Sequence, residues 1–230
     1  ADVDAGLSLD ALMAAGLPFG LWVPVLPGTR QVPVGGAIAH DIHGKNHHGA
    51  GTFGCHVRAL EILCSDGSRT ICSTQSESGL FNATIGGLGL TGLITWAEIR
   101  LKKIVSSCIS MESIKVRDLD EFLDLSANSD TEFEYTVSWL DSLAKGNNSG
   151  KGVFLRGNHC QDAGRRLDVH RQTKLPWPME APNFLLNRLS IQAFNFLYYN
   201  KQLGREKKAI VHYDPFFFPL DAVHDWNRVY

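Results

Sequence analysis

The chain has 230 residues, of which 44% are hydrophobic and 20% are charged, and its formal net charge is −2. This is the composition of a globular protein with room for one large domain or two small ones. No strongly basic run indicates a nucleic-acid partner, and no apolar stretch approaches the roughly 20 residues of a membrane span.

The first hundred residues predict short helices and strands. Ser8 is a typical N-cap for a helix over 9–15, with Gly16 as its stop. Four prolines then make residues 17–33 too broken for a helix. The turn Ser65–Ser68 contains Asp-Gly between apolar runs, which predicts a hairpin of two strands. We place these strands at 57–64 and 69–72, and expect a further helix over 78–84 and a further strand over 93–102.

The pattern changes near Lys103, where we expect a domain boundary. The expected strands are 111–116, 135–140 and 153–156, and Asp118 is the expected cap of a helix ending at Leu125. Polar loops are predicted at 126–132 and 145–152, and irregular structure at 159–171. The chain opens on what reads as a strand already under way and closes without a terminator. We therefore expect an internal piece of a longer protein, whose targeting signals are not visible.

The cysteines show no regular spacing and no CxxC pair. An odd, scattered set favours reduced, buried thiols over a disulfide framework or a zinc site. The five are Cys55, Cys64, Cys72, Cys108 and Cys160.

A glycine motif at residues 87–92 matches the dinucleotide fingerprint GxGxxG. That fingerprint binds a pyrophosphate only between a strand and a following helix. Here the expected order is helix first and strand second, so a Rossmann site is not predicted. The glycines are better explained by a tight turn that passes under a ligand or a neighbouring strand.

Histidines are concentrated in the glycine-rich segment 35–56. A metal site would need two imidazoles on a common face, and the glycines around Gly44 argue against a helix that could supply one. A polar loop satisfied by hydrogen bonds and a ligand-binding loop remain open. Lys45 is equally compatible with a solvated charge and with a partner for a negative charge. The histidines are His40, His43, His47, His48 and His56.

Trp139 and the run Phe216–Phe218 are the remaining candidates. Buried aromatic rings usually belong to the core, and this is the default interpretation. A position in the wall of a pocket is the alternative.

Several of these segments together resemble one family. They are residues 21–32, 35–48 with His-Gly-Lys-Asn-His-His at 43–48, 51–54 and 86–92, with weaker matches at 218–221 and 226–228. The chain resembles the second half of the PCMH-type FAD-binding domain of the vanillyl-alcohol-oxidase superfamily. Within it, oxidases of polyprenyl-phosphoryl sugars are the most similar. The resemblance implies an α+β fold, with an FAD-binding lobe over 1–102 and part of an antiparallel-sheet substrate domain over 103–230.

The resemblance also implies roles for residues. His43 and Lys45 would face the substrate side of the flavin, with His43 as base and Lys45 holding an anionic flavin or a substrate phosphate. Trp139 and Phe217 would lie in the substrate pocket. In the most similar oxidases a cysteine stands in place of His40 and a tyrosine in place of Phe217. The flavin contacts would be Gly28, Pro33, Val34, Gly35, Gly36, His40, Asp41, Ile42, His43 and Ile94.

The implied activity is FAD-dependent oxidation of a secondary alcohol of a sugar, in the 2′-epimerisation that supplies arabinan-type cell-wall precursors. An aldonolactone or alditol oxidase and a non-catalytic flavin-fold piece are the alternatives, because a fold does not fix a substrate. The expected partners are the sugar substrate, free or linked to polyprenyl phosphate, an unidentified electron acceptor and a partner reductase. No metal is expected. The expected location is the cytoplasm, a membrane surface or the periplasm, without a membrane span.

Overall fold

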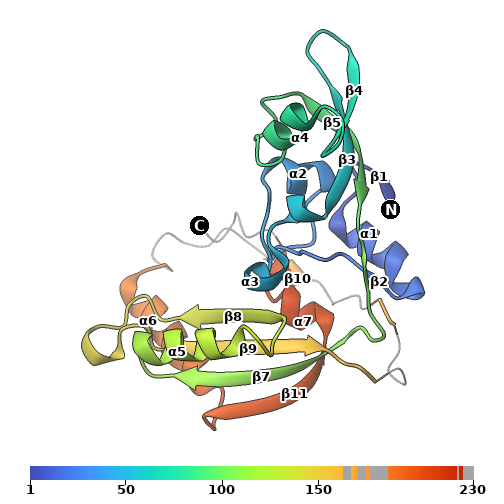
Figure 1. The fold of residues 1–230 in the computed structure, drawn as a ribbon. Coiled ribbons are helices and arrows are strands. Elements are labelled where there is room, and N and C mark those ends of the chain that lie inside the picture. Colours follow the sequence, from blue (N-terminus) through green and yellow to red (C-terminus); the bar gives the residue numbers. More distant parts are fainter. Residues whose placement is uncertain (163–166, 170–174, 177–185, 222, 225–230) are drawn as a thin grey trace. The chain divides into compact units, whose positions relative to one another are not determined.

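A computed structural model describes the chain except for residues 163–166, 170–174, 177–185, 222 and 225–230 (Figure 1). The predicted α+β class is confirmed, because helices accompany sheets whose strands are almost all antiparallel. The chain divides into two units. Unit 1 comprises Ala1–Ser107 and Gln161–Val169, and unit 2 comprises Cys108–Cys160 and His170–Tyr230. The tail of the weaker motif, 226–228, lies outside the described residues.

Unit 1 is built on a four-stranded antiparallel sheet in the order β1-β5-β3-β4. Its strands are β1 (Asp2–Asp4), β5 (Leu93–Ile99), β3 (Val57–Leu63) and β4 (Arg69–Ser73). Leu60 and Ala97 are directly paired and fully buried, so the core of this unit lies on their face of the sheet. The predicted hairpin is confirmed, with Gly67 in the left-handed region at φ 85°.

The helices of unit 1 are α1 (Leu9–Gly16), α2 (Val34–Ala39), α3 (His47–Ala50) and α4 (Ser78–Thr84), with 3₁₀ turns η1 (Leu17–Phe19) and η2 (Phe53–His56). The helix at 78–84 and the Ser8 cap are confirmed, and the Ser8 side chain accepts a hydrogen bond from the Ala11 amide. The α-helix does stop at Gly16, as predicted. Gly16 stays right-handed, and the chain continues into η1 until Gly20, at φ 67°, ends the turn.

Two predictions for unit 1 need correction. The strand expected over 93–102 ends at Ile99, and β6 (Lys102–Lys103) pairs separately with β2 (Leu21–Trp22). The glycine-rich segment does contain short helices, α2 and α3. Tertiary contacts outweigh the weak helix propensity of glycine. The Gly35 amide donates to the Ala5 carbonyl at 2.8 Å, and a Cβ on Gly35 would lie 2.9 Å from the Ala5 side chain.

Unit 2 contains a second four-stranded antiparallel sheet, in the order β11-β7-β9-β8 (Figure 1). Its strands are β11 (Glu206–His212), β7 (Cys108–Val116), β9 (Gly152–His159) and β8 (Tyr135–Leu140). The helices are α5 (Leu119–Ser129), α6 (Arg188–Asn200) and α7 (Tyr213–Phe217), with a 3₁₀ turn η3 (Gly146–Asn148). The short strands β10 (Leu175–Pro176) and β12 (Val223–His224) pair in parallel.

The three strands predicted in unit 2 are confirmed, although β7 and β9 are longer than expected. Asp118 caps α5, as predicted, by accepting from the Glu121 amide at 2.9 Å. The loop predicted at 126–132 was wrong in its first part, because α5 continues to Ser129. The Ser129 hydroxyl is buried and donates to the Leu125 carbonyl, so this polar group is satisfied within the last turn.

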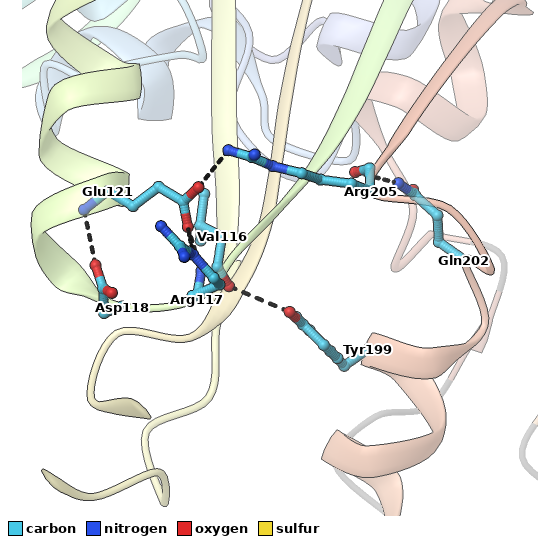
Figure 2. Close-up of polar contacts among 7 residues, drawn as sticks. All are labelled: Val116, Arg117, Asp118, Glu121, Tyr199, Gln202 and Arg205. Carbon is cyan, nitrogen blue, oxygen red and sulfur yellow. Dashed lines mark hydrogen bonds and ion pairs between the residues drawn. The ribbon is translucent and has the colours of Figure 1, made fainter. Parts of the chain in front are cut away.

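A polar corner joins the start of α5 to the segment between α6 and β11 (Figure 2). The Glu121 carboxylate accepts from the Arg117 amide at 2.7 Å and from the Arg117 side chain at 3.1 Å, and it also pairs with Arg205. Burial opposes ionisation of Glu121, but these hydrogen bonds and charges outweigh it and lower its pKa. The corner therefore ties together elements that are far apart in the sequence.

Candidate functional site

The loop that contains the histidines is held against the segment before Gly28. Asn46 is buried, and its side-chain amide donates to the Pro24 carbonyl at 2.9 Å. A Cβ on Gly44 would lie 2.8 Å from the Leu26 carbonyl oxygen, so only glycine permits this approach. The loop is thus fixed by its backbone and by one buried amide, which leaves its other side chains available for a ligand.

Asp41 closes the base of the same loop. Its backbone has φ 42°, an unusual conformation for a residue with a side chain. Its carboxylate accepts a hydrogen bond from the Gly54 amide at 2.8 Å, and the Phe53 amide donates to the Ile42 carbonyl at 2.8 Å. His43 and Thr52 then pair as an isolated antiparallel bridge. The predicted flavin position Asp41 therefore also has a structural role.

The predicted flavin contacts from 33 to 43 lie in α2 and at its two ends. The His40 ring lies 3.0 Å from the Gly36 carbonyl oxygen, and the Ile42 amide donates to the Ala37 carbonyl at 3.1 Å. The members of the set differ in exposure: Gly28, Pro33, His40 and His43 are exposed, Gly35, Gly36, Asp41 and Ile42 are half-buried, and Val34 and Ile94 are buried. Ile94 belongs to β5, against which α2 packs.

His43 and Lys45 are neighbours in this loop with different surroundings. The His43 side chain is exposed, and its ring meets the His47 ring edge-on at 5.6 Å between centroids. Lys45 is half-buried, and burial lowers its pKa. Desolvation disfavours the ammonium ion, and a negative charge placed beside it would reverse this effect. His43 can thus act as an exposed acid–base group, and Lys45 as a cation that an anionic ligand would stabilise.

The geometry of the loop fits an edge of a flat cofactor ring such as the isoalloxazine of FAD. A Cβ on Gly28 would have no heavy atom within 4 Å, so the surface beside this backbone is open. Pro33 and the imidazoles of His40 and His43 are also exposed. Small residues let a ring approach the backbone, and the imidazoles add hydrogen-bonding groups. The residues present are therefore compatible with the cofactor that the resemblance implies.

The glycine turn at 86–92 does not bind a pyrophosphate in the Rossmann manner. It follows α4 and precedes β5, as predicted. The Gly86 amide donates to the Ile38 carbonyl at 3.0 Å, and the Leu88 amide donates to the Ala39 carbonyl at 2.8 Å. A Cβ on Gly92 would lie 2.6 Å from the Ile62 side chain. The turn therefore supports the end of α2 and passes closely over β3.

A cavity of about 850 Å³ in unit 1 lies apart from most of the predicted flavin contacts and shares only Asp41 with them. It is bounded by η2, β3 and α4, and charged side chains such as Arg58, Glu98 and Arg100 line it. The sequence offered no sign of this cavity, because its walls come from five separate segments.

The two predicted pocket residues belong to unit 2. Trp139 is half-buried in β8, with its ring 4.7 Å from the Tyr198 ring of α6. Phe217 is fully buried in α7, and its ring meets Tyr135 edge-on at 4.8 Å. Tyr135 and Trp139 are four residues apart on one strand, so their side chains point to the same face of the sheet. Trp139 therefore belongs to this face of the sheet, and Phe217 packs against the same face as part of an aromatic core.

The structure also bears on the cysteines, on metal binding and on a membrane span. All five cysteines are free thiols, and Cys72 and Cys160 are buried. Within the described part of the chain, no three His, Cys, Asp or Glu side chains gather as metal ligands would. None of the helices described there has the length and apolarity needed to cross a bilayer.

Sequence reasoning missed the function of Asn46 in the loop. An asparagine among glycines and histidines looks like an ordinary turn residue. Its partner, the Pro24 carbonyl, lies 22 residues away in the sequence, so no local pattern could reveal the contact.

Comparison with known proteins identifies relatives of this arrangement. Residues 1–73 match the family described as FAD binding domain. The whole chain is 40% identical, over 240 aligned residues, to 52% of a decaprenylphosphoryl-β-D-ribose oxidase from Mycolicibacterium smegmatis. An uncharacterized protein from Streptomyces coelicolor is 33% identical over 90% of the chain and 55% of its own length. Cytokinin dehydrogenase 10 of Oryza sativa subsp. japonica is 36% identical over 44% of the chain and 18% of its own length. The chain thus spans about half the length of the first two relatives.

Proposed function

We propose that this chain belongs to the vanillyl-alcohol-oxidase superfamily, with its PCMH-type FAD-binding domain, and that its protein is an FAD-dependent oxidoreductase acting on a CH–OH group of a sugar. Our specific proposal is the 2′-oxidation of decaprenylphosphoryl-ribose or a close analogue, a step of the 2′-epimerisation that leads to arabinan-type precursors. The observation that carries it is the 40% identity to an oxidase of that name, which extends through both units.

Within this proposal the two units have different tasks. Unit 1 supplies the flavin surface from Gly28, the 33–36 turn and the 40–43 stretch. Unit 2 supplies part of the substrate domain, with Trp139 and Phe217 at the pocket. The similarity to a cytokinin dehydrogenase covers 44% of the chain, whereas the similarity to the ribose oxidase covers all of it. This contrast supports a cofactor domain shared by both relatives and a substrate specificity determined by the rest of the chain.

His43 would take the hydroxyl proton of the substrate. It is exposed, and histidine ordinarily titrates near neutral pH, where a general base is most effective. Lys45 would stabilise a negative charge on the flavin or on the substrate phosphate, and its burial makes it responsive to such a charge. FAD, when bound, supplies the two-electron oxidation itself.

The proposed substrate is a membrane lipid, so we expect the protein to act at a membrane surface, on the cytoplasmic or the periplasmic side. A partner reductase is expected to complete the epimerisation by reducing the keto product. An electron acceptor has to reoxidise the flavin, and its identity is open.

An absorbance spectrum of the full-length protein tests the proposal directly. The purified protein should show a flavin spectrum, which should bleach when polyprenyl-phosphoryl ribose is added without an electron acceptor. Bleaching only by free alditols or aldonolactones would replace the substrate by that second class. A colourless protein that cannot be reconstituted with FAD would contradict the proposal and favour a non-catalytic flavin fold.

A further inference from the structure

The inner side of α6 is fastened to unit 2 largely by polar groups. Asn195 is buried, and its side-chain amide donates to the Asp141 carboxylate at 2.5 Å. The Tyr199 hydroxyl lies 3.5 Å from the Val116 carbonyl oxygen that accepts its hydrogen bond, as Figure 2 shows. Just beyond the helix, the Gln202 amide donates to the Ser113 carbonyl at 3.1 Å. Tyr198, which packs on Trp139, adds an aromatic contact. These contacts fix which side of α6 faces outward.

The outward side carries several large apolar side chains. Leu189, Phe194, Phe196 and Leu197 are exposed by 77%, 57%, 66% and 67%, and Leu203, just after the helix, by 98%. At 100° per residue the four helical side chains fall within one arc of roughly 160°. We call these four side chains and Leu203 the outer arc of α6.

This arrangement inverts the usual one. A helix on the surface of a globular protein normally packs its apolar stripe against the core and shows its polar face to water. In α6 Asn195 is buried and Tyr199 is half-buried, whereas the most exposed large apolar side chains are Leu and Phe. A contiguous exposed apolar surface of this kind marks a site of interaction.

The charges around the outer arc indicate what it meets. Between 186 and 212 the chain has five basic residues and one acidic residue, although its total net charge is −2. Two of the basic residues form ion pairs within unit 2, Arg205 with Glu121 and Lys208 with Glu112, so Arg188, Lys201 and Lys207 are the cations considered for a partner. A twofold contact between two copies would bring the same surface against itself and place these cations opposite one another. An anionic lipid surface would instead neutralise them. The basic residues are Arg188, Lys201, Arg205, Lys207 and Lys208, and the acidic one is Glu206.

We propose that α6 docks the protein on an anionic lipid bilayer, with the outer arc in the boundary between headgroups and acyl chains. Apolar residues on one side of an interfacial helix and cations at its flanks are the chemistry of such binding. The cations of this segment lie at both ends of α6, at Arg188 and from Lys201 onward. The inference does not rest on the flavin chemistry, since it concerns a different surface and a different ligand.

Vesicle co-sedimentation of the full-length protein tests this proposal. The probes are vesicles of phosphatidylcholine alone and vesicles with about one third phosphatidylglycerol. The unmodified protein should bind the anionic vesicles, and the binding should weaken at about 0.5 M salt because screening shortens the reach of the cations. The variant Leu189→Gln/Phe196→Gln/Leu197→Gln should bind with at least a roughly tenfold lower partition coefficient.

Matched controls separate docking from general surface polarity and from misfolding. Phe19→Gln/Leu90→Gln removes two side chains of unit 1 that are exposed by 80% and 89%, and it should leave vesicle binding unchanged. The single change Leu203→Gln lies outside the helix and should weaken binding even if the triple variant does not fold.

Three results would overturn the proposal: no binding of the unmodified protein to anionic vesicles, equal binding by the Leu203→Gln variant, or a dimer that the outer-arc changes dissociate without affecting vesicle binding. The last would assign the surface to a second copy. A flavin spectrum recorded on the same samples reports on the proposed oxidoreductase independently.

Discussion

His43 and Lys45 belong to one short loop, yet the structure gives them different environments. His43 is exposed at an antiparallel bridge with Thr52, whereas Lys45 is half-buried. If both act in catalysis, their removal should have different consequences, because one moves a proton and the other stabilises a charge. The predictions for single residues follow from this difference.

Replacing His43 by Gln should lower kcat by about 10²- to 10⁴-fold, the usual contribution of a general base. Flavin content should stay the same, because the loop is fixed by Asn46 and Gly44. Stopped-flow reduction of the flavin by the sugar substrate, measured across pH, checks both points. His48→Gln changes another exposed histidine of the same segment and should keep nearly full activity. Equal losses in the two variants would remove His43 from the proton-transfer step.

Replacing Lys45 by Met should lower kcat by roughly 10- to 100-fold, since hydrogen bonds to charged groups contribute about 1.5–3 kcal/mol. The same substitution should raise, not lower, the free energy of unfolding of the flavin-free protein. Burial lowers the pKa of Lys45 from 10.5, so the folded flavin-free protein binds fewer protons than the unfolded chain between the two pKa values. The penalty is complete below the folded pKa and fades as pH rises toward 10.5.

Calorimetry of the flavin-free protein checks the Lys45 prediction. The Lys45→Met variant should melt at the same or a higher temperature than the parent near neutral pH, and its advantage should shrink at alkaline pH. Lys103→Met, at an exposed position, should show no such pH dependence. A variant that melts below the parent near neutral pH would contradict the burial argument.

At the scale of elements, the sheet of unit 2 contains a charge ladder across three strands. Glu112 of β7 is paired in register with Lys208 of β11 and Arg156 of β9. Its carboxylate lies 2.5 Å from the Lys208 ammonium and 2.7 Å from the Arg156 guanidinium. The hydrogen bond from Lys208, followed by that from Arg156, lowers the pKa of Glu112.

The Glu112 ladder predicts a pH-dependent stability. A carboxylate with a lowered folded pKa contributes stability above its unfolded pKa of about 4.5, and loses it as pH falls through the folded value. Glu112→Gln should therefore reduce the free energy of unfolding by about 1 kcal/mol at neutral pH, because Lys208 is largely exposed. The difference from the parent should vanish in strong acid. Urea titrations at several pH values measure this difference in the free energy of unfolding, and Glu132→Gln, at an exposed position, is the control. A difference that does not change with pH would contradict a contribution from the Glu112 ion pairs.

Elements also show where local patterns mislead. Ser129 extends α5 through a hydrogen bond to Leu125 that the polar sequence 126–132 concealed. Helix α6 was not predicted, although Asn187 and Ser190 form a capping box at its start. Its apolar side faces outward. The usual sequence criterion assumes that the apolar side of a helix faces the core, and it therefore does not apply to α6.

At the scale of the whole molecule, the proposed cofactor contacts and the proposed substrate-pocket residues belong to different units. Trp139 belongs to unit 2, and the proposed flavin contacts belong to unit 1. Trp139→Ala should therefore raise KM for the polyprenyl-phosphoryl sugar by about tenfold, the loss expected for one well-packed ring, with an unchanged flavin spectrum. Steady-state kinetics and the absorbance spectrum of one preparation check this. Loss of flavin together with substrate affinity would place Trp139 in a structural role instead.

The sequence by itself determined the α+β class, the hairpin around Gly67, the two side-chain caps at Ser8 and Asp118, and the exclusion of a Rossmann turn. These depend on contacts between residues close in the chain, where propensity and turn chemistry decide the structure. The motifs at 21–54 also indicated a flavin-binding family, and residues 1–73 match the family described as FAD binding domain.

Only the tertiary structure decided the arrangement of the histidine loop and the orientation of α6. The Asn46–Pro24 hydrogen bond and the close approach of Gly44 to Leu26 join segments about twenty residues apart, and they position His43 and Lys45. The outward face of α6 likewise depends on Asn195 reaching Asp141, 54 residues away. Contacts between residues so far apart in the sequence leave no local pattern. From the sequence alone, the histidine loop could be either a polar turn or a ligand site, and its geometry follows only from the tertiary structure.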